Sequence, residues 1–220
     1  MNFKFLSALL LVANEALAQT PPGFSPSTKN TLGVKYGNIN ASNGDLVPIS
    51  DAAMSSTLSF ASNNASHVVV LVDLDAPNGT DSHAYAPFLH WVKFIPSGVT
   101  TLPGGPPLNM SDFAPYFGPA PPPGTGPHRY VTLLFGTQNS TFQVPPSFKQ
   151  FNGTEVTDRI KFDIETFVDE GRLDLVAANW FTSENNTAVA AVTNDAPRMG
   201  VAGAAALVAF GLLRFASQLI

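Results

Sequence analysis

Three segments of this chain are apolar on both faces of an extended backbone, and they constrain the fold more than any other feature. The first is HVVVLVDLD at residues 67–75, with five successive apolar residues between turn-forming sequences. The second is FLHWVKFI at residues 88–95, and the third is RYVTLLFGT at residues 129–137. Side chains alternate along a strand, so these runs predict central strands that are buried on both faces.

The same alternation predicts which side chains of residues 88–95 share a face. On one face we expect Phe88, His90, Val92 and Phe94. On the other face we expect Leu89, Trp91, Lys93 and Ile95.

Residues 163–170 are the one stretch with the spacing of an amphipathic helix. Ile164, Phe167 and Val168 fall at positions i, i+3 and i+4, and Gly171 is placed to supply the C-cap. A further strand is predicted at LVAANWF, residues 175–181. Nineteen prolines and 17 glycines supply many turns. The chain is therefore predicted to be mainly β, with one or two short helices near the C-terminus.

The N-terminus has the features of a secretory signal. Residues 1–18 combine Lys4 with an apolar run and then Ala16-Leu17-Ala18, a small-x-small cleavage pattern. This order predicts a signal peptide that is removed before Gln19. The folded domain is then expected to cover residues 19–184.

The C-terminus has the features of a GPI-attachment signal. Residues 199–220 are an apolar tail interrupted only by Arg214, and residues 185–198 form the small-residue linker and spacer before it. A single-pass anchor is the alternative, but it would need a longer clean apolar run. The candidate attachment residues are Asn185, Asn186 and Asn194.

Other features fit a secreted glycoprotein held outside the cell. There is no cysteine, so the core has to be sufficient without disulfides. The net charge of −5 argues against nucleic acid as a partner. We expect a monomer on the outer face of the plasma membrane or the cell wall, touching the membrane only through its lipid anchor. Seven Asn-x-Ser/Thr sequons occur, at Asn40, Asn64, Asn78, Asn109, Asn139, Asn152 and Asn185.

Polar side chains interrupt the apolar strands at their ends. Asp73 and Asp75 close the first strand, His90 interrupts the second, and His128 opens the third beside a stiff run, GPAPPPGTGP, at residues 118–127. Buried polar groups need partners, so these groups are expected to meet at one edge of a sheet.

Four interpretations of this constellation are open. Two carboxylates and two imidazoles could hold a metal ion, but no close paired spacing supports that. An Asp–His pair could activate water for ester hydrolysis, although there is no G-x-S-x-G motif. The same residues could be satisfied core groups and turn caps. They could also line a small preformed pocket for a phosphate-bearing, zwitterionic molecule, with the proline run as its wall.

The blocks VDLDAP at 72–77, FLHWVKFIP at 88–96 and YFGPAPPPGTGPHRYVTLLF at 116–135 resemble the signature blocks of the phosphatidylethanolamine-binding protein family. The resemblance extends over residues 28–183. It implies a β-sandwich of antiparallel sheets and a non-catalytic binding protein without a cofactor. Its ligand would be a phosphate-bearing small molecule or a phospholipid headgroup. The implied pocket residues are Asp73, Asp75, Pro77, His90, Tyr116, Gly118, His128 and Tyr130.

The family resemblance also raises a second function, inhibition of a serine carboxypeptidase, while a weak Asp–His ester hydrolase is the third. Two positions depart from the family pattern. Leu74 stands where a proline is usual, and Ala120 occupies a position that favours glycine. We expect Arg129 to form an ion pair, because its side chain points to the face opposite His128 and Tyr130.

Overall fold

The computed structural model describes residues 19–61, 64–77, 83–106, 112–138 and 141–187 of the 220-residue chain. The predicted signal peptide, the apolar tail and the candidate site Asn194 lie outside these residues. Among the described residues, no helix has the length and hydropathy needed to cross a bilayer.

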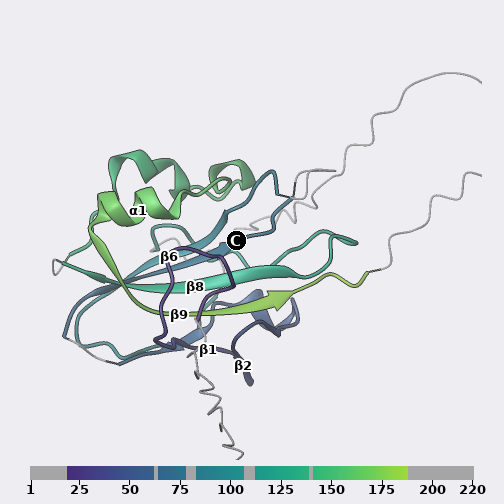
Figure 1. Ribbon diagram of the computed structural model, residues 1–220, viewed down its shortest axis with the longest axis horizontal. Coiled ribbons are helices and arrows are strands. Elements are labelled where there is room, and N and C mark those ends of the chain that lie inside the picture. The colour runs from purple at the N-terminus through teal and green to yellow at the C-terminus, as the bar shows by residue number, and fades with distance from the viewer. Residues whose placement is uncertain (1–18, 62–63, 78–82, 107–111, 139–140, 188–220) are drawn as a thin grey trace, which may run out of the picture.

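The protein is a β-sandwich, and helix α1 (Ile164–Gly171) lies on one outer face of it (Figure 1). The five-stranded sheet has the order β3-β9-β8-β5-β6, and the four-stranded sheet has the order β2-β1-β4-β7. The large sheet contains β3 (Asp45–Leu46), β5 (His67–Asp73), β6 (Phe88–Ile95), β8 (His128–Thr137) and β9 (Leu173–Ser183). The small sheet contains β1 (Gly33–Tyr36), β2 (Ile39–Ala41), β4 (Thr57–Ser59) and β7 (Thr101–Leu102). The helices are η1 (Asp51–Ala53), η2 (Pro146–Asn152), η3 (Val156–Asp158) and α1 (Ile164–Gly171).

The predicted central strands are confirmed, and the mainly β fold class with them. Strands β5, β6 and β8 lie next to one another, and every residue of β5 is buried. All pairs in the large sheet are antiparallel except one, because the short edge strand β3 runs parallel to β9.

Two separate cores explain why these strands are apolar on both faces. Between the sheets, Val69 and Leu71 of β5 pack with Tyr36 and Phe181. On the opposite face, the alternate residues of β5 pack against aromatic side chains from η2, α1 and the segment that precedes α1. This helix-side core includes Val68, Val70, Val72, Phe148, Phe151, Phe162 and Phe167. Burial of a large aromatic side chain contributes about 1.5–3 kcal/mol, so both layers hold the sheet in place.

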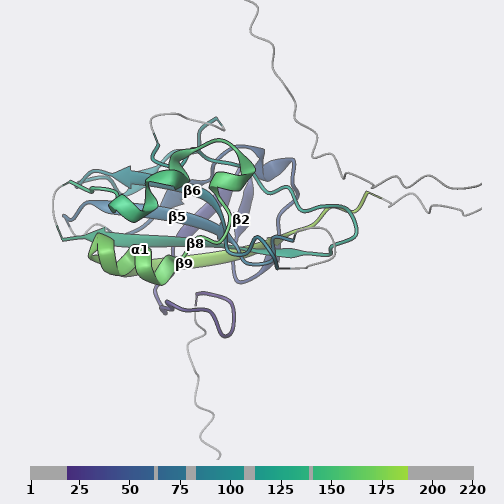
Figure 2. The ribbon, with the colours of Figure 1, turned by 90° about the horizontal axis from the view of Figure 1, so that it is seen from above.

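Helix α1 lies over the sheet near the beginning of β9 (Figure 2). Its N-cap is Asp163, whose carboxylate accepts hydrogen bonds from Thr166 N at 3.0 Å and Thr166 Oγ1 at 2.7 Å. The C-cap differs from the prediction. Gly171 is the last helical residue, and Arg172 instead adopts the left-handed conformation with φ of 50°.

The predicted faces of β6 are wrong at one end because the strand contains a β-bulge. Leu71 pairs with Trp91 and Val72 pairs with Leu89, so His90 is the extra residue. Leu89 therefore joins Val92 in the helix-side core, on the same face. The bulge separates His90 from that face and places its ring beside Phe88, with 5.0 Å between the ring centroids.

We expect Phe162→Ala to lower the free energy of unfolding by about 3–5 kcal/mol, because it removes the buried ring that contacts Phe148 and Phe167 and leaves a cavity. Urea denaturation measures the change. Leu46→Ala is the control at a site that is 53% exposed, and its effect should stay within about 0.5 kcal/mol. Equal stability of the two variants would contradict the assignment of Phe162 to the core.

Candidate functional site

Three neighbouring strands bring their polar residues to the end of the large sheet where β9 also ends. Asp73 is the last residue of β5, and it pairs in register with Tyr130 of β8 and Phe88 of β6. The convergence predicted from the sequence is therefore present. The polar groups surround a cavity of about 270 Å³ whose walls include Asp73, Pro77, His90 and His128.

Asp73 and His128 form a hydrogen-bonded pair in the wall of this cavity. His128 Nδ1 lies 2.8 Å from Asp73 Oδ2, and the two residues are 2% and 4% exposed. The other carboxylate oxygen accepts the backbone N–H of Asp75 at 2.7 Å. Both Asp73 oxygens are thus held by the protein, and the pairing offsets the cost of burying the carboxylate.

The remaining nitrogen of His128 is bonded to Thr125. His128 Nε2 lies 2.9 Å from Thr125 Oγ1, and that hydroxyl lies 2.8 Å from the carbonyl oxygen of Pro122. A hydroxyl has one proton, so it donates either to His128 or to Pro122. In the second case His128 donates at both nitrogens and forms an ion pair with Asp73. In either case the protein engages both ring nitrogens.

His90 has a fixed tautomer. Its Nδ1 lies 2.6 Å from the carbonyl oxygen of Phe117, which can only accept, so Nδ1 carries the proton. Its Nε2 is buried and makes no hydrogen bond to any of the described residues. Burial lowers the pKa of His90 to about 4, against the opposing attraction of the Asp73 carboxylate. The ring is therefore neutral near pH 7, with a lone pair on Nε2.

Arg159 lies behind the His90 bulge and is fully buried. Its Nη1 donates to the carbonyl oxygens of Leu89 at 3.2 Å and His90 at 3.3 Å. The guanidinium also lies 5.8 Å from the centroid of the Phe117 ring. Burial lowers the pKa of Arg159 to about 10, so the group keeps its charge at neutral pH. It satisfies the carbonyl groups of the bulge and holds His90 in its orientation.

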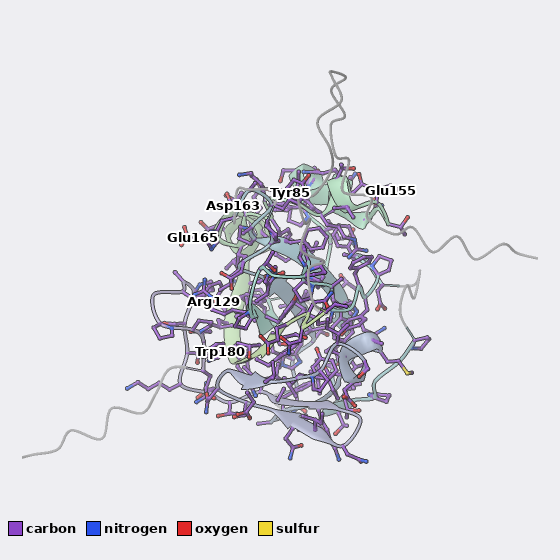
Figure 3. The ribbon with its side chains drawn as sticks, turned by 90° about the vertical axis from the view of Figure 1, so that its right-hand side faces the viewer. Tyr85, Arg129, Glu155, Asp163, Glu165 and Trp180 are labelled. Carbon is purple, nitrogen blue, oxygen red and sulfur yellow. The ribbon has the colours of Figure 1, made fainter. Side chains whose placement is uncertain are left out.

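The second carboxylate, Asp75, does not line the cavity. It forms a bidentate ion pair with Arg129, with Nε–Oδ2 at 2.8 Å and Nη2–Oδ1 at 2.7 Å. Although burial opposes the effect, the bonds to Arg129 lower the pKa of Asp75. The ion pair expected for Arg129 is confirmed, and this side chain lies on the same side of the molecule as Trp180 (Figure 3).

Three other predicted pocket residues stand behind the walls. Tyr116 donates its hydroxyl to the carbonyl oxygen of Ala52 at 2.7 Å. Gly118 passes so close to the same segment that an added Cβ would lie 2.9 Å from Ala52 O. Tyr130 is fully buried and packs edge to face against His90, with 5.2 Å between the centroids. Whether these residues contribute to ligand binding stays a prediction.

The two departures from the family pattern have different consequences. Leu74 donates its backbone N–H to the carbonyl oxygen of Arg129 at 3.0 Å, a bond that a proline could not make. Leucine therefore adds a link between the ends of β5 and β8. Ala120 lines the cavity together with Pro122, in the run that the sequence identified as a wall.

Several residues that line the cavity were not predicted from the sequence. Phe88 and Phe117 supply apolar walls, Val156 of η3 closes one side, and Tyr85 adds a hydroxyl. Tyr85 lies toward the same end of the molecule as Glu155, the neighbour of Val156 (Figure 3). The aromatic residues lie within or next to the quoted blocks, so they could have been proposed. Val156 comes from a segment without periodicity, and no sequence signal marked it.

The sequons divide between described and undescribed residues. Asn40, Asn64 and Asn152 are exposed, and Asn185 is half-buried beside the exposed Asn186. Asn78, Asn109 and Asn139 lie outside the described residues. In the part of the chain that the structure describes, no three His, Cys, Asp or Glu side chains are grouped as a metal site.

Comparison with known proteins identifies relatives of this chain. The sequence model of the family "Phosphatidylethanolamine-binding protein" matches residues 25–168. The phomoidride biosynthesis cluster protein N of Talaromyces stipitatus is 37% identical over 191 residues, which is 78% of this chain and 93% of that protein. The carboxypeptidase Y inhibitor of Saccharomyces cerevisiae is 33% identical over 133 residues, which is 53% of this chain and 58% of that protein.

Solved structures share the fold at lower identity. The carboxypeptidase Y inhibitor, in complex with its cognate proteinase, aligns with a TM-score of 0.55 at 22% identity, covering 72% of this chain and 84% of that one. The phosphatidylethanolamine-binding protein of Plasmodium vivax aligns with a TM-score of 0.51 at 14% identity, covering 74% of this chain and 91% of that one.

We expect His90 to make the fold sensitive to acid. The unfolded chain protonates this histidine near pH 6.5, whereas the folded chain does so near pH 4. Its contribution to stability is therefore complete above pH 6.5 and falls by about 3 kcal/mol as the pH is lowered to 4. The His90→Phe variant, which cannot be protonated, should lose correspondingly less stability over this range in urea denaturation.

Leu46→Ala is the control for this measurement, because Leu46 is 53% exposed and does not titrate. This variant should lose as much stability between pH 7 and pH 4 as the unaltered chain does, to within about 0.5 kcal/mol. If His90→Phe follows the same pH profile as the unaltered chain, the buried neutral histidine is not responsible for the sensitivity.

Proposed function

Because the chain belongs to the phosphatidylethanolamine-binding protein family, we propose that it is a non-catalytic binding protein for a phosphate-bearing small molecule or a phospholipid headgroup. The observation that carries this proposal is the cavity itself, in which Asp73, His90 and His128 converge on apolar walls. A preformed, mostly apolar cavity with a few placed polar groups is the usual form of a small-molecule site.

The size of the cavity supports a headgroup as its occupant. Its volume is about 270 Å³, just below the range of about 300–1,000 Å³ typical of sites for drug-sized ligands. A phosphoethanolamine group is smaller than such ligands, whereas two acyl chains are far larger. A phospholipid would therefore insert its headgroup and leave its chains outside.

The charges of the site favour a zwitterion over a bare anion. Asp73 is a buried carboxylate in the cavity wall, and it attracts the ammonium group of a ligand. Arg159 lies behind the wall without a hydrogen bond or ion pair to a carboxylate among the described residues, and its positive charge favours an anion nearby. A ligand with both charges interacts favourably with each group.

A second function is supported by one relative. The yeast protein named carboxypeptidase Y inhibitor is 33% identical to this chain, and the chain spans 58% of its length. We propose inhibition of a serine carboxypeptidase as the alternative. In that case a protein surface, rather than the cavity, makes the contact.

We also propose that the domain acts outside the cell. The observations behind this are the sequence of residues 1–18, the apolar tail and the sequons, three of which stand at exposed asparagines. In this proposal the chain is a monomer tethered by a GPI anchor at Asn185, Asn186 or Asn194. Detection of an anchor-bearing C-terminal peptide by mass spectrometry tests it.

We expect the full chain to bind phosphoethanolamine, and Asp73→Asn to weaken binding at least about tenfold. The substitution removes the charge that attracts the ammonium group and weakens the bond to His128. Isothermal titration calorimetry measures both affinities. Asp174→Asn removes an equal charge at an exposed position of β9 and should leave the affinity unchanged. The absence of binding by the folded, unaltered chain at millimolar ligand would reject the proposed function.

If the alternative holds, the chain should inhibit carboxypeptidase Y, and His128→Ala should leave the inhibition constant unchanged. The reason is that His128 is 2% exposed and cannot contact a protein partner directly. Titration of peptidase activity with each variant measures this. Loss of inhibition in a folded His128→Ala variant would instead place the cavity within the inhibitory mechanism.

A further inference from the structure

Residues 19–28 form a loop whose two ends are joined by a hydrogen bond. The backbone N–H of Gln19 donates to the carbonyl oxygen of Thr28 at 2.8 Å. Within the loop, the N–H of Phe24 donates to the carbonyl oxygen of Pro21 at 3.1 Å. This N-terminal loop is the purple loop on the side of the molecule where β9 and α1 lie (Figure 2).

Hydrogen bonds and apolar contacts hold the N-terminal loop against the sandwich. Thr20 is 2% exposed, and Phe24 packs against the helix-side core. Directly after the loop, the Asn30 side chain donates to the carbonyl oxygen of Val176 at 2.9 Å. The carbonyl oxygen of Asn30 accepts the N–H of Ala178 at 3.0 Å. The chain is therefore folded from the first residue of the loop onward.

Removal of residues 1–18 would make Gln19 the first residue of the mature chain. In the uncleaved chain, the Nα atom of Gln19 is part of a peptide bond and is not a nucleophile. After cleavage it is an α-amine. An α-amino group has a pKa of about 7.7–8.0, so part of it is the neutral, nucleophilic form near pH 7. The side-chain carbon Cδ of the same residue lies at the distance along the chain that closes a five-membered ring with Nα.

Building on the proposal that the domain acts outside the cell, we infer that Gln19 is a modification site: after residues 1–18 are removed, it cyclises to a pyroglutamyl residue. The lone pair of Nα attacks Cδ, a bond forms between these two atoms, and the bond between Cδ and Nε2 breaks. One proton passes from Nα to Nε2, which leaves as ammonia. The product is a neutral lactam, and the reaction needs no oxidant, reductant or second substrate.

The N-terminal loop suits the lactam at both of the polar atoms that the lactam keeps. The lactam nitrogen has one N–H group, and the structure directs the Gln19 N–H to the carbonyl oxygen of Thr28. The lactam carbonyl oxygen is the former Oε1, and the structure buries that atom. Cyclisation therefore preserves the bond that joins the two ends of the loop.

The loss of charge favours the lactam in the folded chain. Gln19 is half-buried and directly precedes the buried Thr20. Burial disfavours a charged group relative to a neutral one, so an α-ammonium group at this position is less favourable than the lactam. The modified chain also has no terminal amine for an aminopeptidase to recognise, which suits a domain that is exposed to extracellular peptidases.

Mass spectrometry of the N-terminal peptide tests the inference, with the full-length gene product made by a secreting eukaryotic host. Amines are acetylated with an isotopically labelled reagent before digestion, so that no ring closes during preparation. We expect a peptide that begins at Gln19, is lighter than the encoded sequence by one ammonia and carries no acetyl label on its N-terminus. Gln19→Asn is the matched control, because its side chain is one methylene shorter and the ring would have four members. Its N-terminal peptide should carry the label.

The same peptide separates failure of the inference from failure of the proposal beneath it. A peptide that begins at Gln19 with a labelled amine would overturn the inference and leave the removal of residues 1–18 in place. A chain that begins at Met1, or at any residue other than Gln19, would reject both the modification and the cleavage before Gln19. None of these results depends on the ligand of the cavity.

NMR spectroscopy tests the fit between the lactam and the N-terminal loop. A lactam N–H gives a ¹H–¹⁵N cross-peak, whereas an α-ammonium group exchanges its protons with water too fast to give one at neutral pH. We expect a cross-peak for residue 19 that is absent in Gln19→Asn. Its exchange with deuterium should be slower in the folded chain than in urea, because the N–H is bonded to Thr28. Equal exchange rates in the two conditions would contradict this fit.

Discussion

The site depends on one buried hydrogen bond, between Asp73 at the end of β5 and His128 at the start of β8. These strands are neighbours in the large sheet, and the two side chains meet on the face that also carries Tyr130. A buried carboxylate without partners would destabilise the fold, so Asp73 has to be matched on both oxygens. Asp73 Oδ2 orients the His128 imidazole. Asp73 Oδ1 accepts the backbone N–H of Asp75 and so fixes the turn after β5. The bond thus sets the shape of the cavity wall.

The central strands could be predicted because their side chains are apolar on both faces, and the two cores supply the reason. The second sheet could not be assembled from the sequence in the same way. Its strands, such as β4 (Thr57–Ser59) and β7 (Thr101–Leu102), are two to four residues long and carry no measurable periodicity. The β-bulge at His90 could not be predicted from the sequence either. It is determined by the pairing of β6 with β5 and by the hydrogen bond from Arg159, and both contacts join residues that are far apart in the sequence.

The polar residues of the site could be identified from their positions at strand ends, but their chemistry could not. The sequence does not show which nitrogen of His90 donates a hydrogen bond and which accepts one. The bond from Nδ1 to the carbonyl oxygen of Phe117 decides this, and it leaves Nε2 as the acceptor. Thr125 was missed for a similar reason: it lies in the glycine- and proline-rich wall, and only the folded turn brings its hydroxyl to His128. Tautomers and hydroxyl partners follow from tertiary geometry.

The walls of the cavity come from segments that are far apart in the chain, from Asp73 on β5 to Val156 on η3. No one of these segments forms the cavity alone, so the unfolded chain has no equivalent of it. Occupation of the cavity must then shift the folding equilibrium of the whole domain, by about 2.7 kcal/mol at a ligand concentration one hundred times the dissociation constant. The melting temperature consequently reports on occupancy, and a collection of small metabolites can be screened by thermal shift before any activity is known.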